Sequence, residues 1–148
     1  MPMLQLEKYF YPNISVKANP EFKAEKKGFS GKLSVKANLV SLSKEERRWE
    51  VSLTIKTVPE NQPIPYRFEL ETVGVFTVSP NFPEAETEEL VRIGGSSLLY
   101  SAAREFLLIL SSRGPLGAIN LPSMSFQKRP KKAKEGEKQP KPKIEKVP

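Results

Sequence analysis

The amino-acid sequence predicts an α+β fold, in which a sheet of about four antiparallel strands precedes a long helix. Two patterns support this prediction. Apolar and polar residues alternate along most of the first half of the chain, which is typical of strands that bury one face. In the second half, residues 98–112 are apolar at most positions and are followed by Gly114-Pro115, which is typical of a buried helix with a sharp end. The 148 residues have the length of about one domain.

The alternating segments predict the strands in chain order. They cover residues 4–7, 14–18, 32–39, 49–57 and 66–78. Turn residues separate these segments at Asn19-Pro20, at Gly28 and Gly31, and in the proline-rich stretch 59–65. The charged run 44–48 is expected to form a further turn.

The last predicted strand changes phase after Gly74. The apolar residues that follow include both Val75 and Phe76, and a glycine at such a phase change is typical of a β-bulge. The residues before the glycine, Phe68, Leu70 and Thr72, would then point to one side of the sheet. We expect a partner to cover that side.

Two helices are expected in the second half of the chain. Acidic residues between Glu84 and Glu89 follow Pro83, which suits the first turns of a helix, and Gly94-Gly95 would end this short helix. A longer helix would begin at a serine cap, Ser96 or Ser97.

The long helix is more apolar than contact with one sheet requires. One stripe consists of Leu99, Ala102, Ala103, Phe106 and Leu110, and three further apolar residues, Leu98, Leu108 and Ile109, fall outside it. Because a sheet covers one side of a helix, we expect a second subunit to cover another side. Burying three more Leu or Ile side chains contributes roughly 5–8 kcal/mol, at about 1.5–3 kcal/mol each, which favours a stable dimer.

The remaining apolar segments are short. Residues 114–126 are expected to form a loop and an extended piece that Pro122 interrupts. The longest apolar run, Phe106 to Leu110, is too short to span a bilayer, and residues 1–12 lack the apolar core of a signal peptide. We therefore expect a cytoplasmic protein without membrane insertion.

The composition excludes several classes of enzyme. The chain contains no Cys and no His, and all 17 of its acidic residues are Glu. Zinc sites of the Cys/His type, thiolate nucleophiles and Ser-His-Asp triads cannot be built from these residues. We expect a protein that is not an enzyme and that uses no cofactor.

The positive charge is concentrated in the last 21 residues. Residues 128–148 carry nine Lys or Arg and three Glu, a net charge of +6, whereas residues 1–127 carry a net charge of +1. The sequence therefore predicts a domain over residues 1–127 and a disordered Lys/Pro-rich tail over residues 128–148. Such a tail either keeps the protein soluble or contacts a polyanion weakly, such as RNA, the ribosome or anionic lipid. The residues expected to make such a contact are Lys128, Arg129, Lys131, Lys132 and Lys134.

Several segments together resemble the SecB family of bacterial export chaperones. They are Phe10 to Val16, Gly74-Val75-Phe76, Leu98 to Glu105, Ser112-Arg113-Gly114 and Ile119 to Phe126. In the run from Tyr100 to Glu105, Ser101 stands where the family has Pro and Ala102 where it has Tyr. The resemblance covers roughly residues 4–126 in order. It implies a four-stranded antiparallel sheet, a long helix at a dimer interface, and two dimers that pair into a tetramer.

The resemblance also implies a function and positions for its sites. The family binds unfolded polypeptides in apolar grooves without ATP and delivers them for translocation. On this chain, the groove residues would be Phe29, Phe76, Leu121 and Phe126. The oligomer interface would use the strand residues Phe68, Leu70 and Thr72 and the helix residues Leu99, Phe106 and Ile109.

The chain departs from the family at the surface that recruits the translocase motor SecA. The family's acidic patch falls on Asn13, Lys17, Arg67 and Glu69, and only Glu69 is acidic. A reversed charge at Lys17 is expected to weaken a contact that depends on the opposite sign. Two alternatives therefore stay open: a SecB-like chaperone for a toxin–antitoxin pair or another non-export client, and a basic-tailed module that binds RNA or the ribosome.

Three remaining motifs have structural interpretations that we prefer. Gly94-Gly95 with the serines after it lacks the lysine of a phosphate-binding loop, so a turn between helices is expected. The acidic residues 84–89 are expected to be a solvated helix face rather than a metal site. Arg104 and Glu105 are expected to form an ion pair or an interface contact rather than a catalytic pair.

Overall fold

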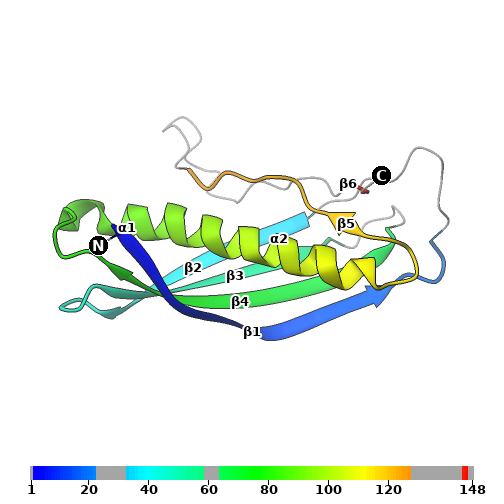
Figure 1. Ribbon diagram of the computed structural model, residues 1–148, viewed down its shortest axis with the longest axis horizontal. Helices are drawn as coiled ribbons and strands as arrows, with labels where there is room; N and C mark the ends of the chain where they lie inside the picture. Colours follow the sequence, from blue (N-terminus) through cyan, green and yellow to red (C-terminus); the bar gives the residue numbers. More distant parts are fainter. Residues whose placement is uncertain (1, 23–32, 59–63, 128–144, 147–148) are drawn as a thin grey trace.

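A four-stranded antiparallel sheet with one long helix lying along it forms the body of the protein (Figure 1). The computed structural model describes residues 2–22, 33–58, 64–127 and 145–146. The sheet has the order β1-β4-β3-β2, so β1 and β2 are its edges. The bounds are β1 Leu4–Ala18, β2 Leu33–Ser43, β3 Arg48–Thr57 and β4 Tyr66–Val78. The predicted α+β class, with four antiparallel strands and a long helix, is confirmed.

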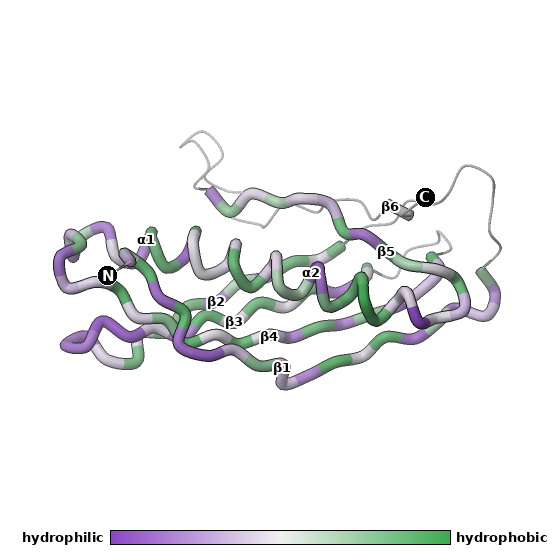
Figure 2. Tube along the Cα trace, in the orientation of Figure 1, coloured by the Kyte–Doolittle hydropathy of each residue, from purple (hydrophilic) through white to green (hydrophobic). Residues whose placement is uncertain are grey.

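The core lies between this sheet and the helix α2 (Ser96–Ser112). From β3, Val51, Leu53 and Ile55 are each 0% exposed, which confirms the face predicted from their alternation. From α2, Leu99, Ala103 and Leu107 are buried against the sheet. Figure 2 shows that hydrophilic residues gather instead in the turn between β2 and β3, where residues 44–47 form the predicted charged turn.

The sequence predicted two separate strands over residues 4–7 and 14–18, but the structure has one strand, β1, with two bulges. β1 pairs with β4 along most of its 15 residues, with register shifts between Leu6 and Lys8 and between Phe10 and Asn13. Each bulge moves the following side chains to the other face of the strand. Because there are two, Leu6 and Ile14 both occupy positions on the helix side, opposite Phe76 and Leu70 of β4.

The bulge predicted after Gly74 is therefore on the neighbouring strand. β4 pairs with β3 without a register shift from Thr77 to Glu69. The apparent phase change arises because β4 is apolar on both faces there: Val75, on the outer face, is only 6% exposed, and Phe76, on the helix face, is 0% exposed. Gly74 serves a different purpose, since a Cβ at this position would lie 2.9 Å from Leu99 of α2.

The helical region is continuous from Glu84 to Ser112. A 3-10 turn (Glu84–Glu86), α1 (Thr87–Leu90) and a π-helical turn (Val91–Gly95) lead directly into α2. The prediction that Gly94-Gly95 ends a helix and that Ser96 caps the next is wrong, because Gly95 has helical dihedral angles and α2 has no side-chain cap. Gly95 instead permits close packing, since a Cβ there would lie 3.0 Å from Val51.

By length and composition alone, the same region is long and apolar enough to cross a membrane. It has 29 residues, and its most apolar 18-residue window has a mean hydropathy of 1.2. The prediction from the sequence considered only the uninterrupted apolar run and therefore missed this longer segment. The core helix of a soluble protein can have the same length and composition, and α2 packs its Leu99 and Leu107 into the core against the sheet.

After α2 the chain turns back along the helix (Figure 1). β5 (Ile119–Asn120) lies at the start of this return and pairs antiparallel with β6 (Glu145–Lys146). Residues 121–127 continue from β5 without regular structure. Residues 145–146 belong to the segment predicted to be a tail, and its other residues, 128–144 and 147–148, lie outside the described residues.

Candidate interaction surfaces

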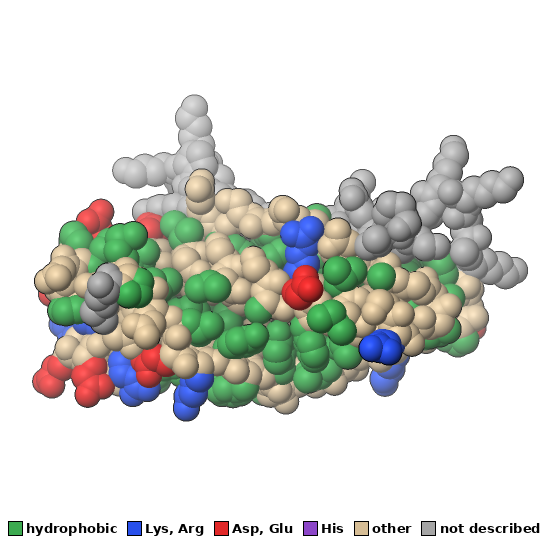
Figure 3. Space-filling model, in the orientation of Figure 1, with side chains coloured by type: hydrophobic (Ala, Val, Ile, Leu, Met, Phe, Trp, Pro, Cys, Tyr) green, Lys and Arg blue, Asp and Glu red, His purple; other side chains and the backbone are tan. Residues whose placement is uncertain are grey.

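An apolar surface extends from the edge strand β1 onto the outward side of α2. Its exposed residues are Tyr9 (45%) and Ile14 (49%) on β1 and Leu98 (45%) and Ile109 (51%) on α2. Figure 3 shows hydrophobic side chains gathered on the face over β1 and α2. We call these four residues, with Tyr11 and Phe106 between them, the α2–β1 surface.

Aromatic contacts connect the two elements of this surface. The rings of Tyr9 and Tyr11 are 6.0 Å apart in an edge-to-face arrangement, and Tyr11 lies 4.7 Å from Phe106. Burial, with a smaller contribution from Tyr9, raises the pKa of Tyr11 to about 12. Its hydroxyl is therefore neutral at physiological pH, so this part of the surface carries no charge that would oppose an apolar partner.

The structure corrects four of the six residues predicted for an oligomer interface. Phe68, Leu70, Thr72 and Leu99 are 4%, 0%, 0% and 1% exposed. The three β4 residues share a face with Phe76 and Val78, and α2 covers that face within the same chain. Phe106 and Ile109 do lie on the α2–β1 surface.

The predicted groove residues do not line an open groove in the described part of the chain. Phe76 and Leu121 are each 0% exposed and Phe126 is 7% exposed, and all three belong to the core. Leu121 and Phe126 are buried because the segment after α2 folds back on the helix, where the Phe126 and Tyr100 rings lie 5.9 Å apart. Phe29 lies outside the described residues.

Three side chains of α2 hold this returning segment in place. The Tyr100 hydroxyl donates to the Pro122 carbonyl at 2.6 Å, and Arg104 Nε donates to Asn120 Oδ1 at 3.3 Å. The buried Ser111 hydroxyl accepts a hydrogen bond from the backbone N–H of Ile119 at 2.8 Å. Tyr100 is itself buried, and this burial raises its pKa to about 12.

The role of Arg104 differs from the one predicted. Its guanidinium donates to Asn120 and also to the Ser123 hydroxyl, at 3.4 Å, while Glu105 is exposed. The charge in this helix thus positions a neighbouring segment, which the sequence alone did not indicate. The only available signal was a charged residue in an apolar helix, followed 16 and 19 positions later by the polar residues Asn120 and Ser123.

The residues predicted for the motor contact lie together on the face of the sheet opposite α2. Asn13 Nδ2 donates to Glu69 Oε2 at 3.1 Å, and Lys17 on β1 lies directly opposite Arg67 on β4. Both of these cationic residues are exposed. On the other side of β4, Lys56 lies opposite Glu69, and Glu71 lies opposite Asn13. Three cationic residues, Lys17, Arg67 and Lys56, thus share this face with the two carboxylates.

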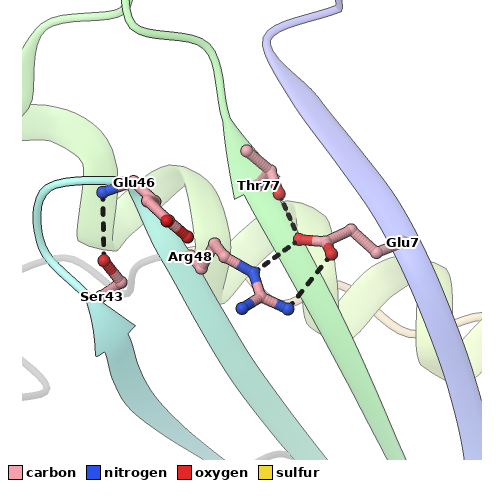
Figure 4. A network of polar contacts seen from close by, with 5 residues as sticks. All are labelled: Glu7, Ser43, Glu46, Arg48 and Thr77. Carbon is pink, nitrogen blue, oxygen red and sulfur yellow. Dashed lines mark hydrogen bonds and ion pairs between the residues drawn. The ribbon is translucent and has the colours of Figure 1, made fainter.

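A second polar network crosses the same face at the first bulge of β1 (Figure 4). Glu7 accepts two hydrogen bonds from Arg48, at 3.1 and 3.2 Å, and one from the Thr77 hydroxyl. These hydrogen bonds, the one from Arg48 first, lower the pKa of Glu7 from its usual value of 4.5. The network connects β1, β3 and β4 where the register shifts.

Comparison with known proteins places the chain in a family. The profile of the SecB family, described as preprotein translocase subunit SecB, matches residues 1–135. The chain belongs to the SecB family. The resemblance seen in the sequence is thereby confirmed. The predicted function as a SecB-family chaperone is confirmed with it.

Two SecB proteins illustrate the similarity. The protein-export protein SecB of Azoarcus sp. (strain BH72) is 28% identical over 141 residues, which cover 91% of this chain and 92% of that protein. A solved structure of a SecB-like chaperone from Mycobacterium tuberculosis, in complex with a peptide from an antitoxin, has a TM-score of 0.64 at 16% identity. The match covers 81% of this chain and 90% of the other, and it shows a shared fold.

Proposed function

We propose that this SecB-family chain is an ATP-independent holdase that binds unfolded polypeptides in the cytoplasm and prevents their aggregation. The observation that carries the proposal is the amount of exposed apolar surface. Eight large hydrophobic side chains among the described residues are 44–58% exposed. Four of these side chains, Met3, Phe10, Val40 and Leu42, lie outside the α2–β1 surface. Apolar surface beside a strand edge such as that of β2 suits low-specificity contact with extended chains. A binding function of this kind requires neither catalysis nor a cofactor.

We further propose that the chain forms homo-oligomers through the α2–β1 surface. A two-fold contact would place the same apolar residues of two copies against each other. It would also cover β1, whose outer edge has no strand partner in the described sheet, and an uncovered edge of this kind promotes aggregation. The aromatic contacts among Tyr9, Tyr11 and Phe106 make this surface well ordered before it meets a partner.

Suppression of aggregation tests the holdase proposal. Full-length protein, and a variant that ends at Gln127, would be mixed with a chemically unfolded client in the absence of ATP. Suppressed light scattering with both proteins, at near-stoichiometric amounts, is the expected result and would assign the activity to residues 1–127. Undiminished scattering with several clients would contradict the holdase function.

A client outside general export is the second candidate function. The motor-contact residues favour it, because Lys17 and Arg67 face one another as exposed cations and only Glu69 retains a negative charge. A related fold, the SecB-like chaperone of M. tuberculosis, was solved with an antitoxin peptide. SecA binding by calorimetry distinguishes the two. Export predicts measurable binding by the native protein, whereas the second candidate predicts binding only after Lys17→Glu and Arg67→Glu restore the acidic patch.

The basic tail is proposed to add a weak contact to a polyanion. Its cationic residues 128, 129, 131, 132 and 134 lie outside the described residues, so the proposal rests on their charge and clustering. When such clusters bind a polyanion, they release the counterions that were bound to it. Added salt makes this release less favourable, so the contact weakens steeply. Binding to RNA or to anionic vesicles that does not change with salt would contradict the proposal.

A further inference from the structure

The segment after α2 is fixed to the helix on one side, and its start pairs with β6. Tyr100, Arg104 and Ser111 fix it through Pro122, Asn120 and Ile119. The three α2 residues are spaced by four and seven positions, so they lie on one side of the helix. The segment is thus held extended before any partner arrives.

The main chain of residues 121–127 makes no backbone–backbone hydrogen bond with any other described residue. Leu121 and Phe126 bury their side chains, whereas Ser123 and Ser125 are exposed. A rigid extended segment with buried apolar side chains and unpaired main-chain groups can accept another extended chain as an added strand.

The chain's own C-terminal region already pairs with the start of this segment. Ile119 lies opposite Lys146 and Asn120 lies opposite Glu145. Because the N–H of Ile119 is directed to Ser111, and successive residues of a strand direct their main-chain groups to opposite edges, the N–H of Asn120 faces the edge where β6 lies. Asn120 and Glu145 are therefore the hydrogen-bonded pair.

The sequence of the tail suits an intramolecular occupant of this kind. Its only large apolar residues, Ile144 and Val147, immediately flank Glu145-Lys146, and the rest of the tail is dominated by Lys, Pro and Glu. Residues 128–144 connect the body to the pair, and a connection of this length gives an effective concentration on the order of millimolar. A two-residue pair is weak by itself, so a competing chain can displace it.

We propose that residues 119–127 form a strand-acceptor edge for extended polypeptide, and that the C-terminal segment around Glu145–Lys146 occupies this edge in competition with unfolded clients. The proposal rests on the proposed holdase function only in naming unfolded clients as the chains that compete with the C-terminal segment. The contact between the tail and β5 is a property of the chain alone, so it can be tested separately.

Two proline variants of the full-length protein test the contact. Glu145→Pro with Lys146→Pro removes the main-chain donors of β6. Glu137→Pro with Lys138→Pro is the matched control, because it changes the same dipeptide elsewhere in the same tail. The readout is amide hydrogen exchange by NMR. We expect the Asn120 amide to lose protection in the first variant only, while the Ile119 amide keeps its protection through Ser111 in both.

Binding experiments then test the competition. The first probe is a fluorescent peptide of residues 143–148, and the second is reduced and carboxymethylated α-lactalbumin, which stays unfolded. If the tail occupies the edge in half to nine-tenths of the molecules, both probes bind the 145/146 variant more tightly than native protein by a factor of about 2–10. The 137/138 variant should bind as the native protein does.

The outcomes separate this proposal from the holdase function. An unchanged Asn120 amide, or equal peptide binding by the native protein and the 145/146 variant, would overturn the tail contact even in an active holdase. Equal binding of the unfolded probe by both would overturn the shared edge. Loss of Asn120 protection with tighter peptide binding would support the tail contact even if no variant suppressed aggregation.

Discussion

The hydroxyl of Ser111, in the last turn of α2, is the hydrogen-bond acceptor for the backbone N–H of Ile119, at 2.8 Å. Both residues are buried, at 0% and 1% exposure. The same hydroxyl donates to the Leu108 carbonyl at 3.3 Å. One serine thus satisfies a buried main-chain donor and sets the direction in which the chain leaves the helix.

Replacing Ser111 with Ala is therefore expected to be costly. The change leaves the Ile119 N–H buried without a partner, and such a loss reduces the free energy of unfolding by about 1–3 kcal/mol. Ser112→Ala is the control, because Ser112 is exposed and donates only to the Ile109 carbonyl of its own helix. Urea unfolding measures both. Equal losses for the two serines would contradict the positioning role of Ser111.

Leu70→Arg tests which face of β4 is internal. The resemblance seen in the sequence placed Leu70 at an oligomer interface, but Leu70 is 0% exposed and packs in the core beneath α2. We now expect the arginine to prevent stable folding, because its charge would be buried without a partner. Arg67→Leu, on the opposite face, is the control. A folded dimer of the Leu70 variant, by circular dichroism and native mass, would instead place Leu70 at an oligomer interface.

Glu7 is expected to make stability depend on pH. The pKa of Glu7 in the folded protein is lowered chiefly by the hydrogen bond from Arg48. The stability that its ionised form contributes is therefore fully present above the pKa of the unfolded chain, and it is lost as the pH falls through the lowered pKa of the folded protein. The effect is small because both side chains are about one-third exposed, at 33% and 37%. Thermal unfolding of Glu7→Gln should therefore show a shallower decrease in Tm below pH 4.5 than native protein. Parallel curves would exclude a role for this ion pair.

The sequence predicted the positions of the strands and of the long helix better than it predicted which side of each strand is buried. Alternation identified the buried side of β3 correctly, because Val51, Leu53 and Ile55 oppose polar neighbours. It failed on β4, where Val75 and Phe76 are buried on opposite faces, since apolar residues on both sides of a central strand remove the period. The side of a strand that a helix covers depends on tertiary packing, and local pattern does not report it.

The candidate sites were predicted less completely for a related reason. Phe76, Leu121 and Phe126 were chosen as large apolar residues, but the return of the chain along α2 buries the last two. The contacts that produce this return, from Tyr100, Arg104 and Ser111, join residues 8 to 22 positions apart. Their spacing matches no local motif. The pairing of Glu145–Lys146 with β5 spans a still longer separation, and the two apolar residues that flank the pair, Ile144 and Val147, do not specify a partner.

Substitution on the α2–β1 surface is expected to reduce self-association without loss of fold. Ile109→Arg places a charge on a side chain that is 51% exposed in the single chain, so the isolated subunit can solvate it. In a two-fold contact the same charge would be buried beside its own copy and would oppose association. Val40→Arg is the matched control, because Val40 is 47% exposed but lies on β2, at the other edge of the sheet. Native mass spectrometry should show a smaller species for the Ile109 variant only, and urea unfolding monitored by circular dichroism should show that both variants fold. An Ile109 variant that keeps the native oligomeric mass would place the interface elsewhere.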